Sequence, residues 1–350
     1  MQKFLLYGAN GYTAGLIIRF AAAYGLEPIV AGRSEDKIKP IAEANGLEYR
    51  IFDVNNLEQT LQNIRDIKIV LHCAGPFKFT AKPMMEACLQ AGAHYLDITG
   101  EIEVFELAAS MKKRAEEANI MLMSGVGFDV VPTDCMALYL KNKMPDATHL
   151  KLAFGATGGG FSHGTALTMA EGLGEKSAAR INGKITPTEL GYRAITVPFD
   201  KKSLFCMSIP WGDVSTAYYT TGIPNIETYT ATSPKSYKWV KYQRYISWIL
   251  RTEFMKNRLR SKIKSRPAGP NDSVREKTHS LVWGEVSNGK TTIAATWSGL
   301  EGYTFTAHSA LLITQKTMNG NWQKGFKTPA MMYGADLAME LAGSVRNDII

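Results

Sequence analysis

The sequence predicts an α/β protein in which a doubly wound parallel sheet is followed by a second, α+β domain. Over roughly the first 130 residues, short apolar runs alternate with helix-compatible stretches. The apolar runs that we interpret as strands are Lys3–Tyr7, Pro28–Ala31, Tyr49–Phe52, Ile67–His72, Tyr95–Ile98 and Ile120–Met123. The stretches that we interpret as helices are Ala14–Tyr24, Glu35–Asn45, Leu57–Ile64, Pro83–Ala91 and Val104–Ala118. This alternation is typical of a parallel sheet with right-handed crossovers and helices on both faces.

The chain of 350 residues is long enough for two hydrophobic cores. Beyond about residue 135 the pattern changes to turn-rich, β-like runs, namely Leu150–Phe154, Tyr218–Thr221 and Thr291–Trp297, which indicate the α+β domain. A last helical stretch, Pro329–Ala342, is expected to pack back on the first domain. We therefore predict a first domain of residues 1–134 and 328–350 and a second domain of residues 135–327.

Several functional classes are disfavoured by composition. No apolar run reaches the roughly 20 residues of a membrane helix, and Lys3–Tyr7 leads directly into Gly8 without the apolar region of a signal peptide. The four cysteines are widely spaced without a Cys-x-x-Cys pair, so neither a disulfide framework nor a metal site is expected. We therefore expect a cytoplasmic protein with free thiols and no metal.

The net charge of +8 comes from one segment, Lys235–Arg266, which has eleven basic residues and one acid and so carries +10. Its apolar residues recur at mostly three-to-five-residue intervals, which predicts one or two amphipathic helices. Two interpretations stay open: the apolar stripe packs on the second domain or on a dimer partner, or it makes peripheral contact with a membrane. A nucleic-acid partner is not expected, because no recognition motif accompanies the charge.

The first predicted strand ends in a glycine-rich turn of the form G-x-x-G-x-x-A. Gly8 permits a tight turn, Gly11 lets the backbone approach a pyrophosphate, and the small Ala14 allows close packing of helix on strand. The helix N-terminus then offers N–H groups and a positive dipole to the phosphates. This context indicates a Rossmann dinucleotide-binding domain. The residues predicted to bind the cofactor in this turn are Gly8, Ala9, Asn10, Gly11, Tyr12 and Thr13.

The residues after the second strand favour NADP(H) over NAD(H). An NAD enzyme usually places an acid there for the ribose hydroxyls, whereas this chain has Arg33 and Ser34, with Lys37 one turn later. A guanidinium can bind a 2′-phosphate through two hydrogen bonds, and the hydroxyl and ammonium groups can add to it. The alternative is that Arg33 is a solvated charge beside a helix cap at Ser34.

Two later turns are predicted to continue the cofactor site along the carboxyl ends of the strands. Asp53 could hold the adenine edge, or it could cap the following helix. The turn after the fourth strand presents small residues and backbone groups to the ribose and nicotinamide. Its residues are Ala74, Gly75, Pro76 and Phe77.

Taken together, these motifs resemble the saccharopine dehydrogenase-like oxidoreductases, and within them the trans-acting enoyl reductase branch. The likeness also includes Tyr95–Glu101, Gly127–Asp134, Ser162–Thr165 and Pro210–Asp213, and it extends over nearly the whole chain. The resemblance implies a Rossmann domain completed by C-terminal residues and an inserted α+β domain that holds substrate and often forms a homodimer. It also implies hydride transfer from a nicotinamide cofactor, and it favours reduction of an enoyl or imine-like small-molecule or acyl substrate.

Four residues are candidates for catalysis. Asp97 and Glu101 lie at a strand end, and Asp129 follows a glycine-rich turn expected near the nicotinamide. His163, between glycines, is the side chain that would titrate near neutral pH. Three of them have a structural alternative: Asp97 could cap a helix, Glu101 could form a surface ion pair, and His163 could simply be exposed. A non-catalytic NADP(H) sensor or scaffold protein is therefore the alternative function.

Overall fold

The computed structural model describes residues 1–158, 162, 167, 176–199, 202–243, 248, 252–265 and 268–349. The chain forms two compact units. Unit 1 comprises Met1–Val131 and Tyr303–Met332, and unit 2 comprises Pro132–Gly302 and Tyr333–Ile350. The units therefore divide the C-terminal part of the chain differently from the division predicted from the sequence, which gave residues 303–327 to the second domain and 333–350 to the first.

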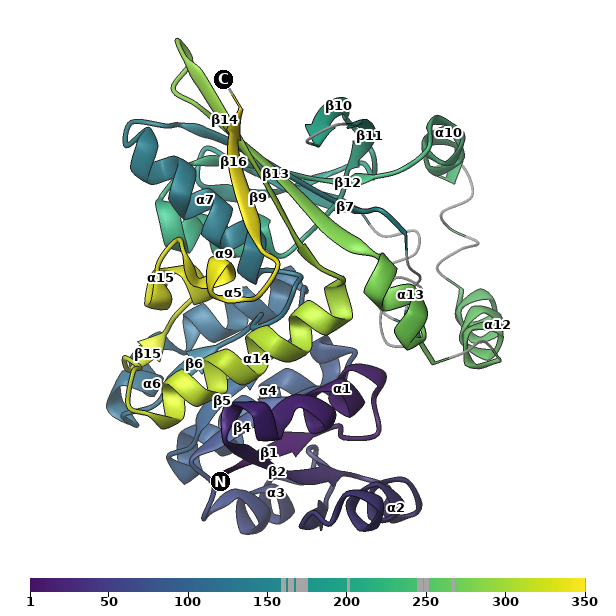
Figure 1. Ribbon diagram of the computed structural model, residues 1–350, viewed down its shortest axis with the longest axis vertical. Coiled ribbons are helices and arrows are strands. Elements are labelled where there is room, and N and C mark those ends of the chain that lie inside the picture. The colour runs from purple at the N-terminus through teal and green to yellow at the C-terminus, as the bar shows by residue number, and fades with distance from the viewer. Residues whose placement is uncertain are drawn as a thin grey trace. The chain divides into compact units, whose positions relative to one another are not determined.

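Unit 1 is built on a seven-stranded sheet in the order β15-β6-β5-β4-β1-β2-β3, in which every pair is parallel (Figure 1). The strands are β1 (Gln2–Tyr7), β2 (Leu26–Gly32), β3 (Tyr49–Ile51), β4 (Ile69–His72), β5 (His94–Asp97), β6 (Met121–Met123) and β15 (Gly325–Phe326). The order of the strands reverses between β1 and β4, so right-handed crossovers place helices on both faces. The predicted Rossmann architecture is confirmed.

The helices of unit 1 follow the predicted alternation. They are α1 (Tyr12–Phe20), the short 3₁₀ helix η1 (Ala21–Tyr24), α2 (Glu35–Asn45), α3 (Leu57–Ile64), α4 (Phe77–Ala91), α5 (Ile102–Ser110), α6 (Lys112–Glu117) and α14 (Gly302–Met318). Helix α4 begins six residues earlier than predicted, at Phe77 instead of Pro83. Pro83 lies inside α4 at its seventh residue, where a proline removes one i→i−4 hydrogen bond, and the helix continues on both sides of it.

Helix α14 enters unit 1 from far along the sequence. Its Thr306 Oγ1 accepts a hydrogen bond from the backbone N–H of Phe128 at 3.0 Å, and its Ser309 hydroxyl donates to the carbonyl of Val126 at 2.7 Å. A Cβ at Gly127 would lie 2.7 Å from Thr306 Cγ2. Helix α14 therefore packs against the turn that follows β6, and this contact places it in unit 1.

The C-terminal stretch Pro329–Ala342 is helical only in part, and of its residues only Pro329–Met332 belong to unit 1. It forms α15 (Pro329–Tyr333) and the 3₁₀ helix η2 (Leu337–Glu340), separated by Gly334 at φ +88°. From Tyr333 onward the chain belongs to unit 2, where β16 (Val345–Ile349) pairs antiparallel with β14 (Thr292–Leu300). This pairing satisfies backbone N–H and C=O groups along one edge of β14, which a helix packed on unit 1 would not reach.

Unit 2 contains a nine-stranded mixed sheet, which confirms the predicted α+β class. Seven strands follow the order β10-β11-β12-β7-β13-β14-β16, and β8 and β9 pair at the side of β12. The remaining strands are β7 (His149–Ala156), β8 (Ser177–Ile181), β9 (Lys184–Thr188), β10 (Ala194–Phe199), β11 (Lys202–Ser208), β12 (Asn225–Ala231) and β13 (His279–Ser287). Its described helices include α7 (Val131–Lys143), α9 (Asp213–Thr221), α10 (Pro234–Gln243), α12 (Glu253–Lys264) and α13 (Asp272–Lys277).

One predicted β-like run in unit 2 was wrong. Tyr218–Thr221 is the last turn of α9, which ends at Gly222 in the left-handed conformation with φ +70°. Tyrosine and threonine favour strands locally, but α9 buries Val214 and Ala217 in unit 2. Burial of this helix outweighs the local preference of its last residues.

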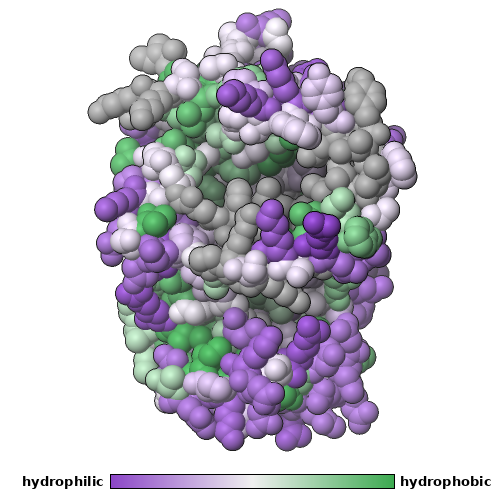
Figure 2. Space-filling view, turned by 90° about the vertical axis from the view of Figure 1, so that its right-hand side faces the viewer, coloured by the Kyte–Doolittle hydropathy of each residue, from purple (hydrophilic) through white to green (hydrophobic). Residues whose placement is uncertain are grey.

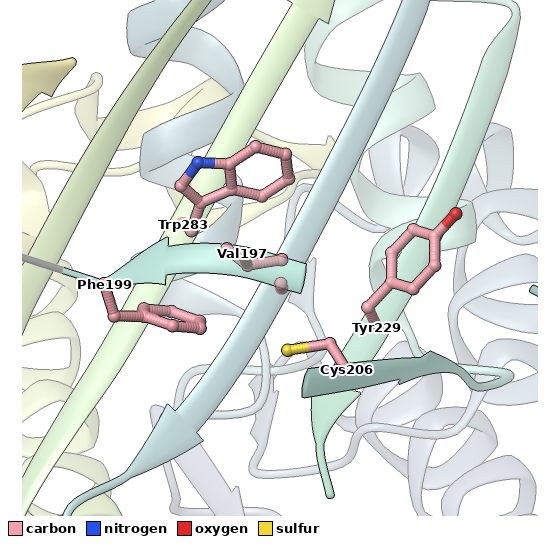
Figure 3. Close-up of a cluster of buried hydrophobic side chains, with 6 residues drawn as sticks. Val197, Phe199, Cys206, Tyr229 and Trp283 are labelled. Carbon is pink, nitrogen blue, oxygen red and sulfur yellow. The ribbon is translucent and has the colours of Figure 1, made fainter. Parts of the chain in front are cut away.

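The core of unit 2 lies where β10 crosses over the central strands (Figure 3). Val197 and Phe199 of β10 and Cys206 of β11 pack with Tyr229 of β12 and Trp283 of β13. Trp283 is 4% exposed and Tyr229 is fully buried. No described helix of the chain is both long and apolar enough to cross a bilayer.

Trp283→Ala is expected to lower the free energy of unfolding by about 3–5 kcal/mol, because a buried indole leaves a cavity that the strands cannot close. Urea titration followed by circular dichroism would measure the loss. Tyr242→Ala is the control: its side chain is 66% exposed, so the change should stay within about 0.5 kcal/mol. A loss below about 1 kcal/mol for Trp283→Ala would contradict the packing of this core.

Candidate cofactor and catalytic site

The turn after β1 lies directly against the end of β4. Gly8 has φ +85°, and a Cβ at this position would lie 2.7 Å from the backbone nitrogen of Ala74. The backbone N–H of Gly8 donates to the carbonyl of Ala31 at 2.8 Å, and that of Gly11 donates to the Gly8 carbonyl at 2.9 Å. Glycine is required at residue 8 because both the conformation and the space exclude a side chain. Strands β1 and β4 flank the point where the strand order reverses, which is where such sheets bind ligands.

Helix α1 begins in this turn without a side-chain cap. Gly11 is its N-cap residue, with φ −77°, and as a glycine it offers no side chain that could cap the first turn. A Cβ at Gly11 would find its nearest neighbour, the Gly8 carbonyl oxygen, at 3.2 Å. Ala14 is fully buried, as close packing of α1 on the sheet requires. These features fit the pyrophosphate of a dinucleotide, which would take the place of the missing cap.

The turn after β2 has the same property. Ser34 is the N-cap residue of α2, and its side chain makes no capping hydrogen bond. Arg33 and Lys37 are exposed, and the Asn10 side-chain oxygen would lie 3.8 Å from a Cβ at Gly32. The first two turns therefore lie side by side. The three groups predicted to recognise a 2′-phosphate lie at an uncapped helix N-terminus.

Two other helices of the same sheet have caps. The Asn56 side chain accepts a hydrogen bond from the backbone N–H of Gln59 at 3.1 Å and so caps α3. The carboxylate of Glu101 caps α4: it accepts from the backbone N–H groups of Phe77 at 2.9 Å and Lys78 at 2.7 Å. A carboxylate already occupies the anion position of α4. Phosphate sites are therefore favoured at α1 and α2 rather than at α3 and α4.

Asp53 forms a local turn instead of capping α3. Its carboxylate accepts a hydrogen bond from the backbone N–H of Asn55 at 3.0 Å. The backbone beside it is held by Tyr7, whose hydroxyl donates to the Phe52 carbonyl at 3.1 Å and accepts from the Val54 N–H at 3.2 Å. Burial raises the pKa of Tyr7, and the charges of Asp53 and Arg33 act on it in opposite directions. The charges of two predicted cofactor residues, Asp53 and Arg33, therefore act on the same buried hydroxyl, that of Tyr7.

The hydroxyl of Thr80 in α4 holds the turn after β4 in place. The Thr80 hydroxyl donates to the carbonyl of Ala74 at 2.7 Å and lies 2.9 Å from Nε2 of His72. Gly75 is exposed and Phe77 is buried. Burial lowers the pKa of His72 to about 3, so this imidazole is neutral at physiological pH. The backbone of residues 74–76 lies at the carboxyl edge of β4, as the prediction for this turn requires.

Asp97 is fully buried and connects two strand ends. Its Oδ1 accepts from the backbone N–H groups of Thr99 at 3.0 Å and Gly125 at 2.9 Å, and its Oδ2 accepts from the hydroxyl of Tyr95 at 2.8 Å. Burial raises the pKa of Asp97 to about 6, although these hydrogen bonds act in the opposite direction. Asp97 does not cap a helix. It fixes the turn after β5 to the turn after β6.

Asp129 belongs to the turn after β6, and its side chain approaches the turn after β5. A Cβ at Gly100 would lie 3.0 Å from its Oδ2, so the carboxyl group faces the turn after β5. Burial raises the pKa of Asp129 to about 7, while the residue as a whole is half-buried. Asp97, Glu101 and Asp129 are thus gathered at the ends of β5 and β6. His163 lies outside the described residues.

Two residues of α14 at this edge were not found from the sequence. Thr306 holds the N–H of Phe128, the residue before Asp129. The ring of Tyr303 packs edge-on against Tyr12 of the first turn, with centroids 5.1 Å apart. Thr306 is 178 positions away from Phe128 in the sequence, so no local pattern indicates that the two residues meet. Knowledge that α14 belongs to unit 1 would have been needed.

Comparisons with known proteins show what the chain is similar to. Residues 4–123 match the family model "Saccharopine dehydrogenase NADP binding domain". The chain is 26% identical over 201 residues to the human saccharopine dehydrogenase-like oxidoreductase, covering 50% of this chain and 47% of that protein. It is 30% identical over 186 residues to a Mycobacterium tuberculosis protein named provisionally as a trans-acting enoyl reductase, covering 49% and 44%. The chain spans about half the length of these curated relatives.

The fold has a counterpart among solved structures. The apo form of saccharopine dehydrogenase (L-Glu forming) from Saccharomyces cerevisiae aligns over 100% of both chains with a TM-score of 0.68 and 12% sequence identity. At this identity the likeness concerns the fold. The sequence match and the glycine turn agree in the first unit: residues 4–123 of this chain are similar to the saccharopine dehydrogenase NADP-binding domain family.

Proposed function

We propose that this chain is an NADPH-dependent reductase of an enoyl or imine-like substrate. The observation that carries the proposal is the pair of uncapped helix N-termini at α1 and α2, one beside Gly11 and the other beside Arg33. The first turn would hold the pyrophosphate, and Arg33, Ser34 and Lys37 would hold the 2′-phosphate. The NADP-binding family of residues 4–123 supports the same cofactor.

The carboxyl edge of β5 and β6 supplies the candidate for proton transfer. A reduced nicotinamide, when bound, supplies the hydride. Because the pKa of Asp129 is raised to about 7, its carboxyl is close to half-protonated at neutral pH and can deliver a proton to a reduced substrate. Asp97 and Glu101 already accept two or more hydrogen bonds each from this unit. We assign these two carboxylates to positioning, and we assign proton donation to Asp129 because its raised pKa suits this step.

An enoyl thioester suits this arrangement because its reduction requires a proton donor. The name of the M. tuberculosis relative supports this class of substrate, which could be a small molecule or an acyl chain. We further propose that the chain acts in the cytoplasm as a homodimer and that unit 2 contributes to substrate binding. A protein that binds NADPH without oxidising it would instead be a sensor or scaffold.

NADPH is expected to raise the melting temperature more than NADH, because Arg33 recognises a phosphate that NADH lacks. Arg33→Ala should weaken NADPH binding about 10- to 100-fold and leave NADH binding nearly unchanged. Arg65→Ala, an exposed arginine elsewhere on unit 1, is the matched control and should change neither. Thermal shift assays and calorimetric titration would measure both effects, and equal shifts for the two cofactors in the unmutated protein would contradict the assignment.

Gly11→Val should abolish cofactor binding and leave the fold intact. The φ of −77° at Gly11 is open to any residue, but a branched side chain would fill the space proposed for the pyrophosphate. Gly15→Val is the control one turn later in α1, because a Cβ there meets nothing within 4 Å. Calorimetry should show NADPH binding for Gly15→Val only. If Gly11→Val bound NADPH normally, the phosphates would have to lie elsewhere.

Asp129→Asn should reduce turnover by about 10²- to 10⁴-fold and leave NADPH affinity unchanged. In the unmutated protein the protonated carboxyl is the active form, so the rate of reduction should fall as pH rises through about 7. The variant should lose this limb of the pH profile. NADPH oxidation with a panel of enoyl thioesters and imines is the measurement, and Glu103→Gln, an exposed acid, is the control. Tight NADPH binding without oxidation by any substrate would favour the sensor.

A further inference from the structure

The segment with the excess positive charge includes the described helices α10 and α12 of unit 2, and it exposes large aromatic side chains on these helices and at Trp248 between them. Trp239 is 69% exposed, Tyr242 66%, Trp248 71% and Phe254 73%. Folding normally buries side chains of this size, and exposed aromatic groups close together mark interaction surfaces. Figure 2 looks onto the side of the molecule that carries α10 and α12 in Figure 1, where hydrophobic (green) and hydrophilic (purple) residues lie next to one another.

Helix α10 shows which of its faces the fold uses. Tyr237 packs edge-on against Phe205 of β11 with ring centroids 5.4 Å apart. A Cβ at Gly191 would lie 3.2 Å from the ring of Tyr237 and 3.5 Å from the side chain of Val240. Tyr237 and Val240 therefore hold the helix to unit 2. Trp239 and Tyr242 have no such role, so the predicted apolar stripe does not serve the core of this chain at these residues.

The opposite face of α10 combines aromatic and basic groups. At 100° per residue, Lys235, Lys238, Trp239 and Tyr242 lie within about a quarter to a third of a turn of one another. All four side chains are exposed. One helix face therefore presents lysines beside a tryptophan and a tyrosine.

Helix α12 repeats the arrangement. Phe254, Arg258 and Lys262 are spaced four residues apart and are exposed, so they follow one face. On another face, Leu259 is half-buried and Ile263 is 8% exposed. Both helices therefore use one apolar face for the fold and offer a second, aromatic and basic face to the surroundings.

We propose that these outer faces dock on an anionic phospholipid membrane. The basic-aromatic surface consists of the outer-face residues Lys235, Lys238, Trp239, Tyr242, Phe254, Arg258 and Lys262, together with the exposed Trp248 between the helices and the exposed Lys241, whose ammonium also lies 5.1 Å from the centroid of the Tyr237 ring. Tryptophan and tyrosine are stabilised at the level of the lipid headgroups, where the ring is in an apolar layer and its polar atom is in water. Lysine and arginine reach the phosphates of the same layer.

Charge complementarity favours this partner over a second copy of the chain. The Lys235–Arg266 segment carries +10 and the rest of the chain about −2, since the total is +8. Two such segments facing one another would repel, whereas an anionic leaflet attracts each of them. The exposed aromatic rings add apolar contact that a purely electrostatic partner would not use. The proposal is independent of the reductase activity.

The test is flotation of the full chain with vesicles. We expect the protein to float with vesicles of equal parts phosphatidylcholine and phosphatidylserine, to remain behind with pure phosphatidylcholine, and to dissociate at high salt. The triple variant Lys235→Ala, Lys238→Ala, Lys241→Ala should bind the anionic vesicles on the order of 100-fold more weakly. The double variant Trp239→Ala, Phe254→Ala should bind at least about 10-fold more weakly at low salt.

Controls distinguish a local effect from loss of net charge or of the fold. Lys68→Ala, Lys112→Ala and Lys113→Ala together remove the same charge from exposed positions of unit 1, and this variant should bind the vesicles normally. Unchanged circular dichroism spectra would show that the variants fold. The proposal is overturned if the unmutated protein does not float with anionic vesicles at low salt, or if the control triple weakens flotation as much as the α10 triple. Tighter binding to mixed-sequence RNA than to the vesicles would also overturn it, as would dissociation of a dimer by the α10 triple without any vesicle binding.

Discussion

The close approach of the β1 turn to the end of β4 is the constraint on which the candidate site depends. The backbone of Ala74 lies where a side chain at Gly8 would have to be, at 2.7 Å from the position of a Cβ. Strands β1 and β4 are adjacent in the sheet, although 61 residues lie between Tyr7 at the end of β1 and Ile69 at the start of β4. Because the turn after β1 lies directly against the backbone at the end of β4, the N-terminus of α1 faces the edge where the strand order reverses. A larger residue at this point would displace both turns and the helix.

The distribution of helix caps then decides what each turn can bind. Every helix of the sheet has a partial positive charge at its N-terminus, but Asn56 and Glu101 already satisfy those of α3 and α4. The termini of α1 and α2 have no such partner among their own side chains. These caps favour phosphate sites at α1 and α2 over α3 and α4. Glu101, which the sequence offered as a catalytic group, accepts the hydrogen bonds of two N–H groups at the start of α4.

A buried network stabilises the other end of the site. Asp97 joins the turns after β5 and β6, and Thr306 of α14 holds the second of these turns at Phe128. Asp129 lies between these supports, with its pKa raised to about 7 by burial. A carboxyl with this pKa can change protonation state near neutral pH only if its surroundings stay in place. We infer that the rigid contacts of Asp97 serve the chemistry proposed for Asp129.

The sequence by itself determined the alternation of strands and helices, the glycine turn and the basic residues after β2. These are local properties: strand and helix periods, the left-handed conformation at Gly8 and the absence of an acid at the end of β2 depend on neighbouring residues. Only the tertiary structure decided that α14 joins unit 1, that β16 pairs with β14, and that Tyr218–Thr221 is helical. The tertiary structure alone also decided which groups Asp97 and Glu101 bind, and that the side chain of Trp239 is exposed. Each of these depends on which distant groups bury a side chain or satisfy a backbone N–H, and no local pattern in the sequence records those partners.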